Sequence, residues 1–325
     1  MRRLPSALVA TLVPLSAAAF DLQGHRGARG LAPENTLPAF AAALSVGVST
    51  LELDVGVTRD GVVVIAHDRR LNPDITRDPS GRWLEHPAPT VRSLSYAEIQ
   101  AYDVGRIRPG IDYAARYPEQ KPADGTRMPR LADLFALLRK SGNATVRFNI
   151  ETKLSPLAPD ETLDPEAFAK ALLEVVRAEG MESRVTLQSF DWRTLKAAQR
   201  VAPQVETSCL TAQQSWMNNI LAGQSEGSPW VAGFQLKEHG SIPRMVKAAG
   251  CGTWSPFFRE IDRASVAEAR SLGLKVLPWT VNDPEQMRAV IELGVDGLIT
   301  DRPDIGRKVL AGSAMALPAP TPVAP

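Results

Sequence analysis

Cysteine is scarce in this sequence, with Cys209 and Cys251 as the only two among 325 residues. Two thiolates are too few for a four-cysteine zinc site. In an oxidising compartment the pair could form one disulfide, whereas a chain with a core of this size could equally keep two buried thiols. The sequence leaves both alternatives open.

An excess of one charge sign is also missing. The chain has 37 Lys and Arg residues against 36 Asp and Glu residues, and its formal net charge is +1. No basic excess argues for nucleic acid, so we expect no nucleic-acid partner, although charge alone says little about partners. After the N-terminal segment no apolar run reaches the length of a membrane-spanning helix, and we expect no stable membrane insertion.

Residues 1–19 have the composition of a signal peptide. Two arginines follow Met1, the next stretch is apolar, and three alanines ending at Ala19 offer a cleavage site. A buried N-terminal helix is the alternative, but Pro5, Pro14 and the missing polar face argue against it. We therefore expect an exported protein, periplasmic or secreted.

From residue 20 onward, short apolar runs alternate with amphipathic stretches, which is typical of βα units and a parallel sheet. Eight such units in this length favour an α/β fold of the TIM (β/α)8 barrel type over residues 20–311. Helices are expected over residues 37–46, 131–140, 165–180, 193–201, 263–273 and 284–294. The expected barrel strands are residues 21–25, 50–57, 145–151, 184–189, 205–210, 252–255, 275–280 and 297–300.

Three stretches depart from this alternation. Residues 59–128 begin with a further strand candidate, Gly61–His67, and are too long for an ordinary loop. They predict a small inserted subdomain after the second barrel strand, over the barrel mouth. Residues Thr211–Trp230 are polar and irregular, and the Ala/Pro-rich tail 312–325 is expected to be disordered.

Carboxylates gather on two neighbouring barrel strands. Glu52 and Asp54 lie two positions apart on one strand, so both side chains point to the same face, and Glu151 ends the next strand. Carboxylates that converge inside a barrel mouth call for a cation, and oxygen ligands alone favour Mg²⁺ or Ca²⁺. We predict one such divalent cation here. Ion pairs with arginines or lysines on the rim are the alternative.

Histidine is rare too, with four residues in the chain. His25 ends the first strand, and His67 precedes Asp68, whose carboxylate would either hold the imidazole ring or cap a turn. A lone histidine is more often structural, but this pair predicts one acid and one base. His86 and His239 lack such surroundings and are expected to be structural or surface residues.

Arg26 and Lys153 are the candidates for binding a phosphate. Arg26 adjoins His25 in a glycine-flanked segment, and Lys153 follows Glu151 by two positions and so faces the same way. Two cations beside a metal would neutralise phosphoryl oxygens as charge shifts in a transition state. An ion pair between Lys153 and the carboxylates is the alternative, and both interactions are compatible in the empty enzyme.

Two later strand ends add Gln188 and Trp279. A polar amide and an aromatic wall suit a small polar substrate. Asn35 and Thr36 stand at a helix start, where an N-cap role is at least as well favoured as a catalytic one. Taken together, these residues indicate an enzyme that acts on a phosphate ester.

The motifs follow one another along residues 20–310. They are His25-Arg26-Gly27, Pro33-Glu34-Asn35-Thr36, Glu52-x-Asp54, His67-Asp68, Asn149-Ile150-Glu151-x-Lys153, Gln188-Ser189-Phe190, Trp279-Thr280-Val281-Asn282 and the segment from Gly297 to Pro303. This ordered set resembles the glycerophosphodiester phosphodiesterase family. The region after Thr211 fits the family less clearly than the rest.

The resemblance implies a TIM barrel with an insertion after the second strand. It also implies hydrolysis of a glycerophosphodiester to glycerol 3-phosphate and an alcohol. By residue, it implies a divalent metal at Glu52, Asp54 and Glu151, acid–base catalysis by His25 and His67, and phosphate contacts from Arg26 and Lys153.

Two other functions fit parts of the pattern. A barrel phospholipase of the D type, acting on a lipid headgroup, would expose an apolar patch or a basic rim at the mouth, whereas residues 59–128 are mixed in charge with few aromatics. A periplasmic protein that binds phosphodiesters without turnover would need the cations but not paired histidines. We therefore expect a small-molecule glycerophosphodiester as substrate. The sequence leaves the oligomeric state open.

Overall fold

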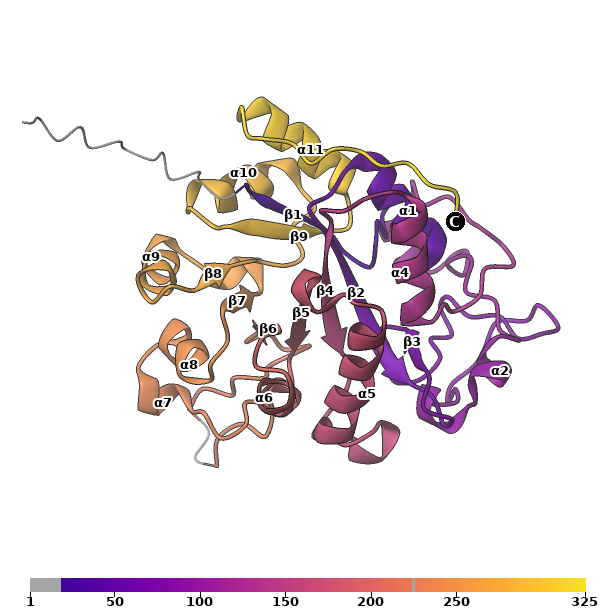
Figure 1. Cartoon of the computed structure of the whole chain (residues 1–325), viewed down its shortest axis with the longest axis horizontal. Helices are drawn as coiled ribbons and strands as arrows, with labels where there is room; N and C mark the ends of the chain where they lie inside the picture. Colours follow the sequence, from indigo (N-terminus) through magenta and orange to yellow (C-terminus); the bar gives the residue numbers. More distant parts are fainter. Residues whose placement is uncertain (1–18, 224–225) are drawn as a thin grey trace, which may run out of the picture.

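The computed structural model describes residues 19–223 and 226–325. Eight parallel strands form a nearly closed barrel with helices around its outside (Figure 1), so the predicted TIM barrel is confirmed. The barrel strands are β1 (Asp21–Gly24), β2 (Thr50–Val57), β4 (Arg147–Thr152), β5 (Val185–Ser189), β6 (Glu206–Thr211), β7 (Thr253–Pro256), β8 (Lys275–Val276) and β9 (Gly297–Thr300).

The strands run in the order β8-β7-β6-β5-β4-β2-β1-β9. Backbone hydrogen bonds bring the two ends of this order together: Asp296 donates to the Val276 carbonyl at 3.0 Å, and Ile299 donates to the Pro278 carbonyl at 3.0 Å. β8 is shorter than the predicted strand over residues 275–280. Pro278 has no N–H for the ladder, which ends the regular pairing there.

Helices separate most of the strands, and several begin with a side-chain cap. Asp164 and Asp283 each accept hydrogen bonds from the first turn of the helix that follows, and each precedes a proline. Two of the longer helices, Ile242–Ala248 and Pro303–Gly312, were not predicted from the sequence. The longer helices are α1 (Leu37–Val46), α4 (Leu131–Lys140), α5 (Pro165–Ala178), α6 (Trp192–Val201), α8 (Ile242–Ala248), α9 (Arg263–Ser271), α10 (Pro284–Glu292) and α11 (Pro303–Gly312), and the short ones are α2 (Tyr96–Ile99), α3 (Asp112–Arg116) and α7 (Leu236–His239).

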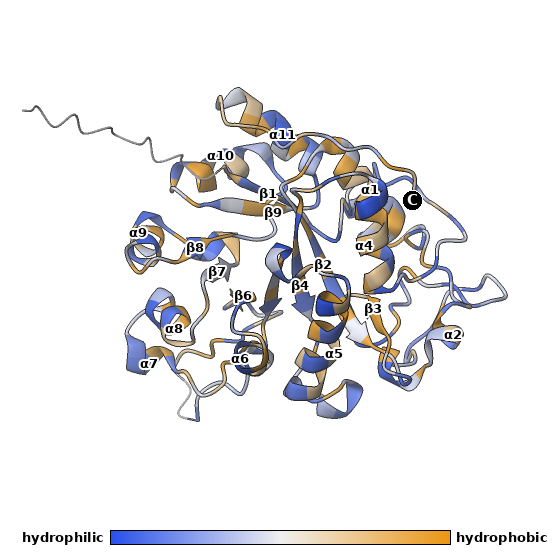
Figure 2. Ribbon diagram, viewed as in Figure 1, coloured by the Kyte–Doolittle hydropathy of each residue, from blue (hydrophilic) through white to orange (hydrophobic). Residues whose placement is uncertain are grey.

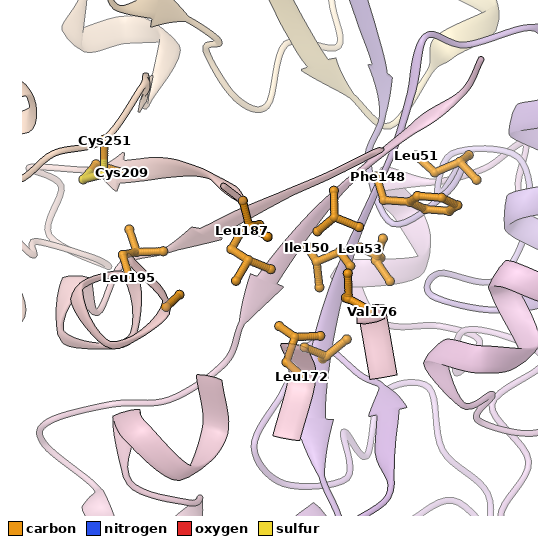
Figure 3. Packing of buried hydrophobic residues seen from close by; sticks show 14 of the residues in the cluster. Leu51, Leu53, Phe148, Ile150, Leu172, Val176, Leu187, Leu195, Cys209 and Cys251 are labelled. Atoms are coloured by element: carbon orange, nitrogen blue, oxygen red, sulfur yellow. A yellow bond between two sulfur atoms is a disulfide. The ribbon is translucent and has the colours of Figure 1, made fainter. Parts of the chain in front are cut away.

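The main core lies between the barrel and its helices. Figure 2 shows apolar and polar residues on different faces of helices such as α5, and the buried residues of α5 are apolar. Figure 3 shows alternate residues of β2, β4 and β5 packed against side chains of α5. The strand residues are Leu51, Leu53, Phe148, Ile150 and Leu187, and the helix residues are Leu172 and Val176. Because strand side chains alternate, the residues between them point into the barrel.

Cys209 and Cys251 form a disulfide with a Cα–Cα distance of 5.9 Å (Figure 3). Cys209 lies in β6, and Cys251 lies just before β7. The structure thus decides between the two alternatives that the sequence left open, and the bond ties together two neighbouring βα units.

Residues 58–130 connect β2 to α4. They contain β3 (Val63–Ile65), which pairs antiparallel with β2, together with α2 and α3. A second, small hydrophobic cluster in this segment includes Val64, Leu71, Val91 and Ile99. That residues 59–128 form a separate subdomain stays a prediction.

The C-terminal tail does not match our expectation of disorder over residues 312–325. After α11 it runs across α1 towards α4 (Figure 1). The amide of Thr321 donates to the Leu44 carbonyl at 2.8 Å, and the side chain of Asn143 donates to the Thr321 hydroxyl at 3.0 Å. Met315 and Val323 pack against the main core. The expectation was wrong because composition does not reveal the contacts with Leu44, Asn143 and the core that the tail makes.

No helix in the described part of the chain is both long and apolar enough to cross a membrane. The signal peptide predicted over residues 1–19 lies, except for Ala19, outside the described residues.

Candidate active site

A cavity of about 570 Å³ opens at the barrel mouth, which the carboxyl ends of the strands form. The structure brings together every residue that the sequence singled out as a site candidate. Asp54 lies buried beside the cavity. The others line it: His25, Arg26, Glu52, His67, Glu151, Lys153, Gln188 and Trp279.

Three buried carboxylates converge on the floor of this cavity. Glu52, Asp54 and Glu151 each place an oxygen within 4.8 Å of the other two. The strand register explains this, because Asp54 of β2 is paired with Glu151 of β4, and Glu52 lies two residues earlier on the same face. We call these three residues the carboxylate cluster.

Burial and mutual repulsion set the protonation of the carboxylate cluster. Burial raises the pKa of Glu52 well above its usual range, and the Asp54 carboxylate raises it further. Burial raises the pKa of Glu151 to about 7, with Lys153 opposing the rise. Burial alone would raise the pKa of Asp54, but His67 and the neighbouring cations hold it below its usual value.

The donor set of the carboxylate cluster fits a hard divalent cation. All three residues offer carboxylate oxygens, which Mg²⁺ and Ca²⁺ prefer. The Oδ1 atom of Asp54 is buried without a hydrogen-bond partner among the described residues, as a free ligand atom would be. The alternative of ion pairs also holds in part, because the Nζ of Lys153 lies 2.7 Å from Glu151 and 3.7 Å from Asp54.

His25 is held at the mouth by a carboxylate from the last barrel strand. Its Nδ1 lies 2.6 Å from the Oδ1 of Asp301, and its Nε2 lies 3.9 Å from Glu52. Arg29 donates to both oxygens of Asp301, at 2.9 and 3.0 Å. Burial lowers the pKa of His25 to about 4, with Arg29 adding to the effect and Asp301 opposing it. The ring is therefore neutral at pH 7, with Nε2 directed towards the carboxylate cluster.

His67 has a similar arrangement, with its Nδ1 against a carboxylate. Its Nδ1 lies 2.9 Å from Asp68, and Asn72 donates to the other oxygen of that carboxylate at 2.8 Å. The Nζ of Lys153 lies 3.1 Å from Nε2 of His67. Burial lowers the pKa of His67, and the nearby Arg26 and Lys153 lower it further.

Arg26 occupies a left-handed backbone position, with φ of 50°. Its amide donates to Glu52 at 2.9 Å and its guanidinium donates to Glu34 at 2.6 Å, while its Nε lies 3.4 Å from Asp54. Gly27 makes the turn possible, since a Cβ there would lie 2.7 Å from the backbone of Ala39. The tight turn therefore places a cation directly over the carboxylate cluster.

Thr36 and Asn35 divide the two roles that the sequence left open. Thr36 is the N-cap of α1 and accepts from the Ala39 amide. Asn35, with φ of 56°, instead donates to the Oδ2 of Asp54 at 2.9 Å and orients that carboxylate.

Gln188 and Trp279 reach the cavity from β5 and from the segment after β8. Gln188 donates to Glu52 at 2.7 Å and accepts from Asn149 at 3.0 Å. The Trp279 indole donates to the Ser255 carbonyl at 2.9 Å, which leaves its ring as part of the cavity wall.

An aromatic wall faces the charged side of the cavity. Trp279 stacks edge to face with Phe190 at 5.3 Å and with Trp216 at 6.0 Å, and Trp216 stacks with Phe257 at 5.5 Å between ring centroids. Phe190, Trp216 and Trp279 line the cavity, and Phe257 contacts the two tryptophans without lining it. We define these four residues as the aromatic wall. Sequence reasoning missed Trp216, because it treated residues 211–230 as a polar irregular stretch.

Sequence reasoning also missed the residues that hold the histidine and arginine side chains. Asp301, at the end of β9, was part of a motif but received no role, although its strand-end position was a usable signal. Tyr113, in α3, and Tyr117, just after it, were not singled out either. The hydroxyl of Tyr117 donates to Asp301 at 3.3 Å, and that of Tyr113 donates to Glu34. Such contacts between distant segments leave no local trace in a sequence.

Comparisons with known proteins agree with one another. The sequence model of the glycerophosphoryl diester phosphodiesterase family matches residues 25–305. A glycerophosphodiester phosphodiesterase from Caldanaerobacter subterraneus is 29% identical over 280 residues, covering 86% of this chain and 93% of the relative. One from Bacillus subtilis is 28% identical over 293 residues, covering 89% of this chain and 85% of the relative.

Solved structures show the same fold. A Silicibacter pomeroyi protein, assigned as a glycerophosphoryl diester phosphodiesterase, has a TM-score of 0.81 and 36% identity, covering 92% of this chain and 95% of that chain. An Oleispira antarctica phosphodiesterase in complex with the product sn-glycerol-3-phosphate has a TM-score of 0.65 at 20% identity, covering 90% and 97% of the two chains. The second likeness concerns the fold alone.

Proposed function

This chain belongs to the glycerophosphoryl diester phosphodiesterase family, and we propose that it hydrolyses glycerophosphodiesters to glycerol 3-phosphate and an alcohol with the help of one divalent cation. The observation that carries the proposal is the convergence of three carboxylates, two histidines and two cationic side chains in one cavity at the barrel mouth. Cationic groups bind the phosphodiester anion, and its cleavage is assisted by one group that accepts a proton and one that donates a proton.

Glu52, Asp54 and Glu151 would hold the divalent cation. A bound Mg²⁺ or Ca²⁺ supplies Lewis-acid chemistry, because it withdraws charge from phosphoryl oxygen and favours ionisation of a hydroxyl nucleophile. Asn35 supports this arrangement, since its hydrogen bond fixes Asp54 and leaves Oδ1 free.

His25 and His67 would exchange protons with the substrate through Nε2. Each has its Nδ1 against a carboxylate, Asp301 or Asp68, and that contact directs the other ring nitrogen to the reacting groups. One histidine accepts the proton of the nucleophile and the other gives a proton to the leaving alkoxide.

Arg26 and Lys153 would bind the phosphoryl oxygens. Both cations contact the carboxylate cluster in this structure, so both lie where the phosphate has to approach the metal. Gln188 orients Glu52, and Trp279 provides part of the wall against which the substrate rests.

One observation favours a second candidate, a phospholipase of the D type acting on lipid headgroups. Trp216 and Leu157 are 61% and 73% exposed, and both follow barrel strands on the mouth side. Exposed apolar side chains beside an active site are typical of contact with lipid. The paired histidines speak against the third candidate, a phosphodiester-binding protein without turnover.

The proposal is tested by incubating the purified protein with glycerophosphocholine and assaying glycerol 3-phosphate, with Mg²⁺ or Ca²⁺ and then with EDTA. We expect product only with the divalent cation. His25→Ala and His67→Ala should each lower kcat by roughly 10²- to 10⁴-fold. His239→Ala, which alters a histidine on α7 outside the cavity, is the matched control. No product under any metal condition would refute the proposed activity on this substrate.

We also propose that the protein is exported. The composition of residues 1–19 supports this, and so does the Cys209–Cys251 disulfide, because disulfides persist mainly in oxidising compartments. Fractionation of cells that express the full chain would test it, and retention of an uncleaved chain in the cytoplasm would contradict it.

A further inference from the structure

The two sides of the active-site cavity differ in charge. Among the described residues, every Lys and Arg that lines it comes from the segments after β1, β2 and β4: Arg26, Arg29, Arg69, Arg116 and Lys153. The lining residues on the β5 to β8 side that the structure describes carry no charge and include Phe190, Trp216, Met217, Trp230 and Trp279. A phosphodiester bound to the cations therefore extends one of its two ester groups towards the aromatic wall.

Trp216 stands at the outer edge of that wall and is 61% exposed, and hydrogen bonds hold the backbone turn that carries it. It lies in a turn closed by the bridge between Gln213 and Asn218 and by the hydrogen bond from Gln214 to Met217 at 2.8 Å. Glu260 fastens the turn, since it accepts from the Gln213 amide at 2.7 Å and from the Gln214 side chain at 2.6 Å. The ring is therefore positioned before any ligand arrives.

Most of the contacting ring pairs in the aromatic wall meet at nearly right angles, whereas Phe257 and Trp279 are inclined by 59°. Trp216 is inclined by 81° to Trp279 and by 83° to Phe257, and Phe190 is inclined by 85° to Trp279. Adjoining aromatic surfaces that face different ways can surround a group from several sides. Quaternary ammonium groups are recognised in this manner, because they lack N–H donors and are attracted to the negative faces of aromatic rings.

We propose that the aromatic wall is the subsite for the alcohol half of the substrate and that it selects alcohols carrying a quaternary ammonium group. This rests on the proposed function. A primary ammonium fits the wall less well, because its N–H donors need acceptors that uncharged rings do not supply. A glycerol alcohol brings neither a cation nor an apolar surface. Trp216 determines this selectivity and takes no part in the proton transfers.

The test compares kcat/KM for glycerophosphocholine, glycerophosphoethanolamine and glycerophosphoglycerol. We expect the parent to prefer the choline diester. Trp216→Leu keeps an apolar side chain but loses the ring, and should reduce the choline preference over glycerol by about threefold to tenfold. Trp216→Phe should retain most of the preference. Trp83→Leu, which removes a tryptophan that stacks on Arg77 within residues 58–130, should leave it unchanged.

A direct measurement separates this inference from the proposed function. Binding of tetramethylammonium by calorimetry needs no turnover, and we expect it in the parent and in Trp216→Phe but not in Trp216→Leu. Equal choline-to-glycerol ratios in the parent and in Trp216→Leu would overturn the inference while leaving the phosphodiesterase intact. A loss of activity in Trp216→Leu that appears only with lysophospholipid micelles would also overturn it, because Trp216 would then serve lipid contact.

Discussion

The Nδ1 atom of His25 lies 2.6 Å from the Oδ1 atom of Asp301, so the residues that directly follow the first and last barrel strands form one dyad. Arg29 and Asn282 hold the carboxylate in place, with Asn282 donating to Oδ2 at 2.7 Å. Burial alone would raise the pKa of Asp301, but Arg29 and His25 hold it well below its usual range. Asp301 is therefore an anion that fixes the tautomer and the direction of the imidazole.

Replacement of Asp301 by asparagine should impair catalysis without removing a group that contacts the substrate. An amide can donate to Nδ1 and favour the wrong tautomer, so we expect kcat to fall by roughly 10²- to 10⁴-fold. Steady-state kinetics across pH would show this as a lower and displaced profile. Asp304→Asn, which alters a carboxylate paired with Arg302, is the control and should change kcat little. A loss of kcat below about tenfold in Asp301→Asn would mean that Asp301 does not act on catalysis through His25.

Glu151→Gln should change how the stability of the cation-free protein depends on pH. Burial raises the pKa of Glu151 to about 7, against about 4.5 for an ordinary glutamate. Between these values the folded state binds more protons than the unfolded state, so the free energy of unfolding falls as the pH rises. The contribution is about 3 kcal/mol. In EDTA, urea denaturation from pH 4.5 to 8 should show the free energy of unfolding of the parent falling relative to that of the variant, because other groups with shifted pKa values, such as Glu52 and His25, are common to both proteins.

Addition of a divalent cation should restore the stability that the cation-free protein loses as the pH rises. At pH 8, Mg²⁺ or Ca²⁺ compensates the ionised carboxylate cluster, and we expect the Tm of the parent to rise with cation concentration. Glu151→Gln should show a much smaller rise. Glu179→Gln, at a surface ion pair with Arg139, should respond as the parent does. Equal cation-induced shifts in all three proteins would place the cation elsewhere.

Gly27→Ala should destabilise the fold more than backbone strain alone explains. Gly27 and Gly61 both have φ of 83°, but only Gly27 is crowded, with the Ala39 backbone 2.7 Å from the position of an added Cβ. The left-handed conformation costs an alanine about 1–2 kcal/mol at either position. Urea denaturation of Gly27→Ala and Gly61→Ala should therefore give a larger loss for Gly27→Ala. Equal losses would show that the turn after His25 relaxes freely.

Removal of residues 316–325 should lower stability and leave kcat unchanged. The deletion removes the hydrogen bonds of Thr321 to Leu44 and to Asn143, and the contact of Val323 with the core. We expect a loss of about 1–3 kcal/mol in the free energy of unfolding. Removal of residues 324–325 alone should cost much less, because the bond that it breaks, from Lys140 to the Ala324 carbonyl, is exposed. A fall in kcat with the longer deletion would contradict the separation of tail and site.

Local patterns predicted much of the barrel. The predicted bounds of β2, β9, α1 and α4 match the structure, because the two strands are buried along their whole length and the two helices pack buried apolar residues against the core. Glu52 and Asp54 were identifiable because carboxylates inside a barrel strand conflict with burial unless they have a function.

The partners of the site residues were not predictable in the same way. Asp301, Tyr117 and Arg29 meet through tertiary contacts between segments far apart in the chain, and no spacing rule connects them. The exposed Trp216 acquires its position from a turn fastened by Glu260, which sequence reasoning did not relate to it. Tertiary packing also overrode composition in the tail.

The closure of the barrel between its first and last strands has a consequence for the timing of synthesis. His25 and Asp301 stand 276 positions apart, so the growing chain carries its histidines, its carboxylate cluster and Lys153 long before the residue that orients His25 is made. A fragment that ends before β9 lacks both the strand beside β1 and the anion of the dyad. The His25–Asp301 dyad can therefore form only after the chain has been made as far as Asp301.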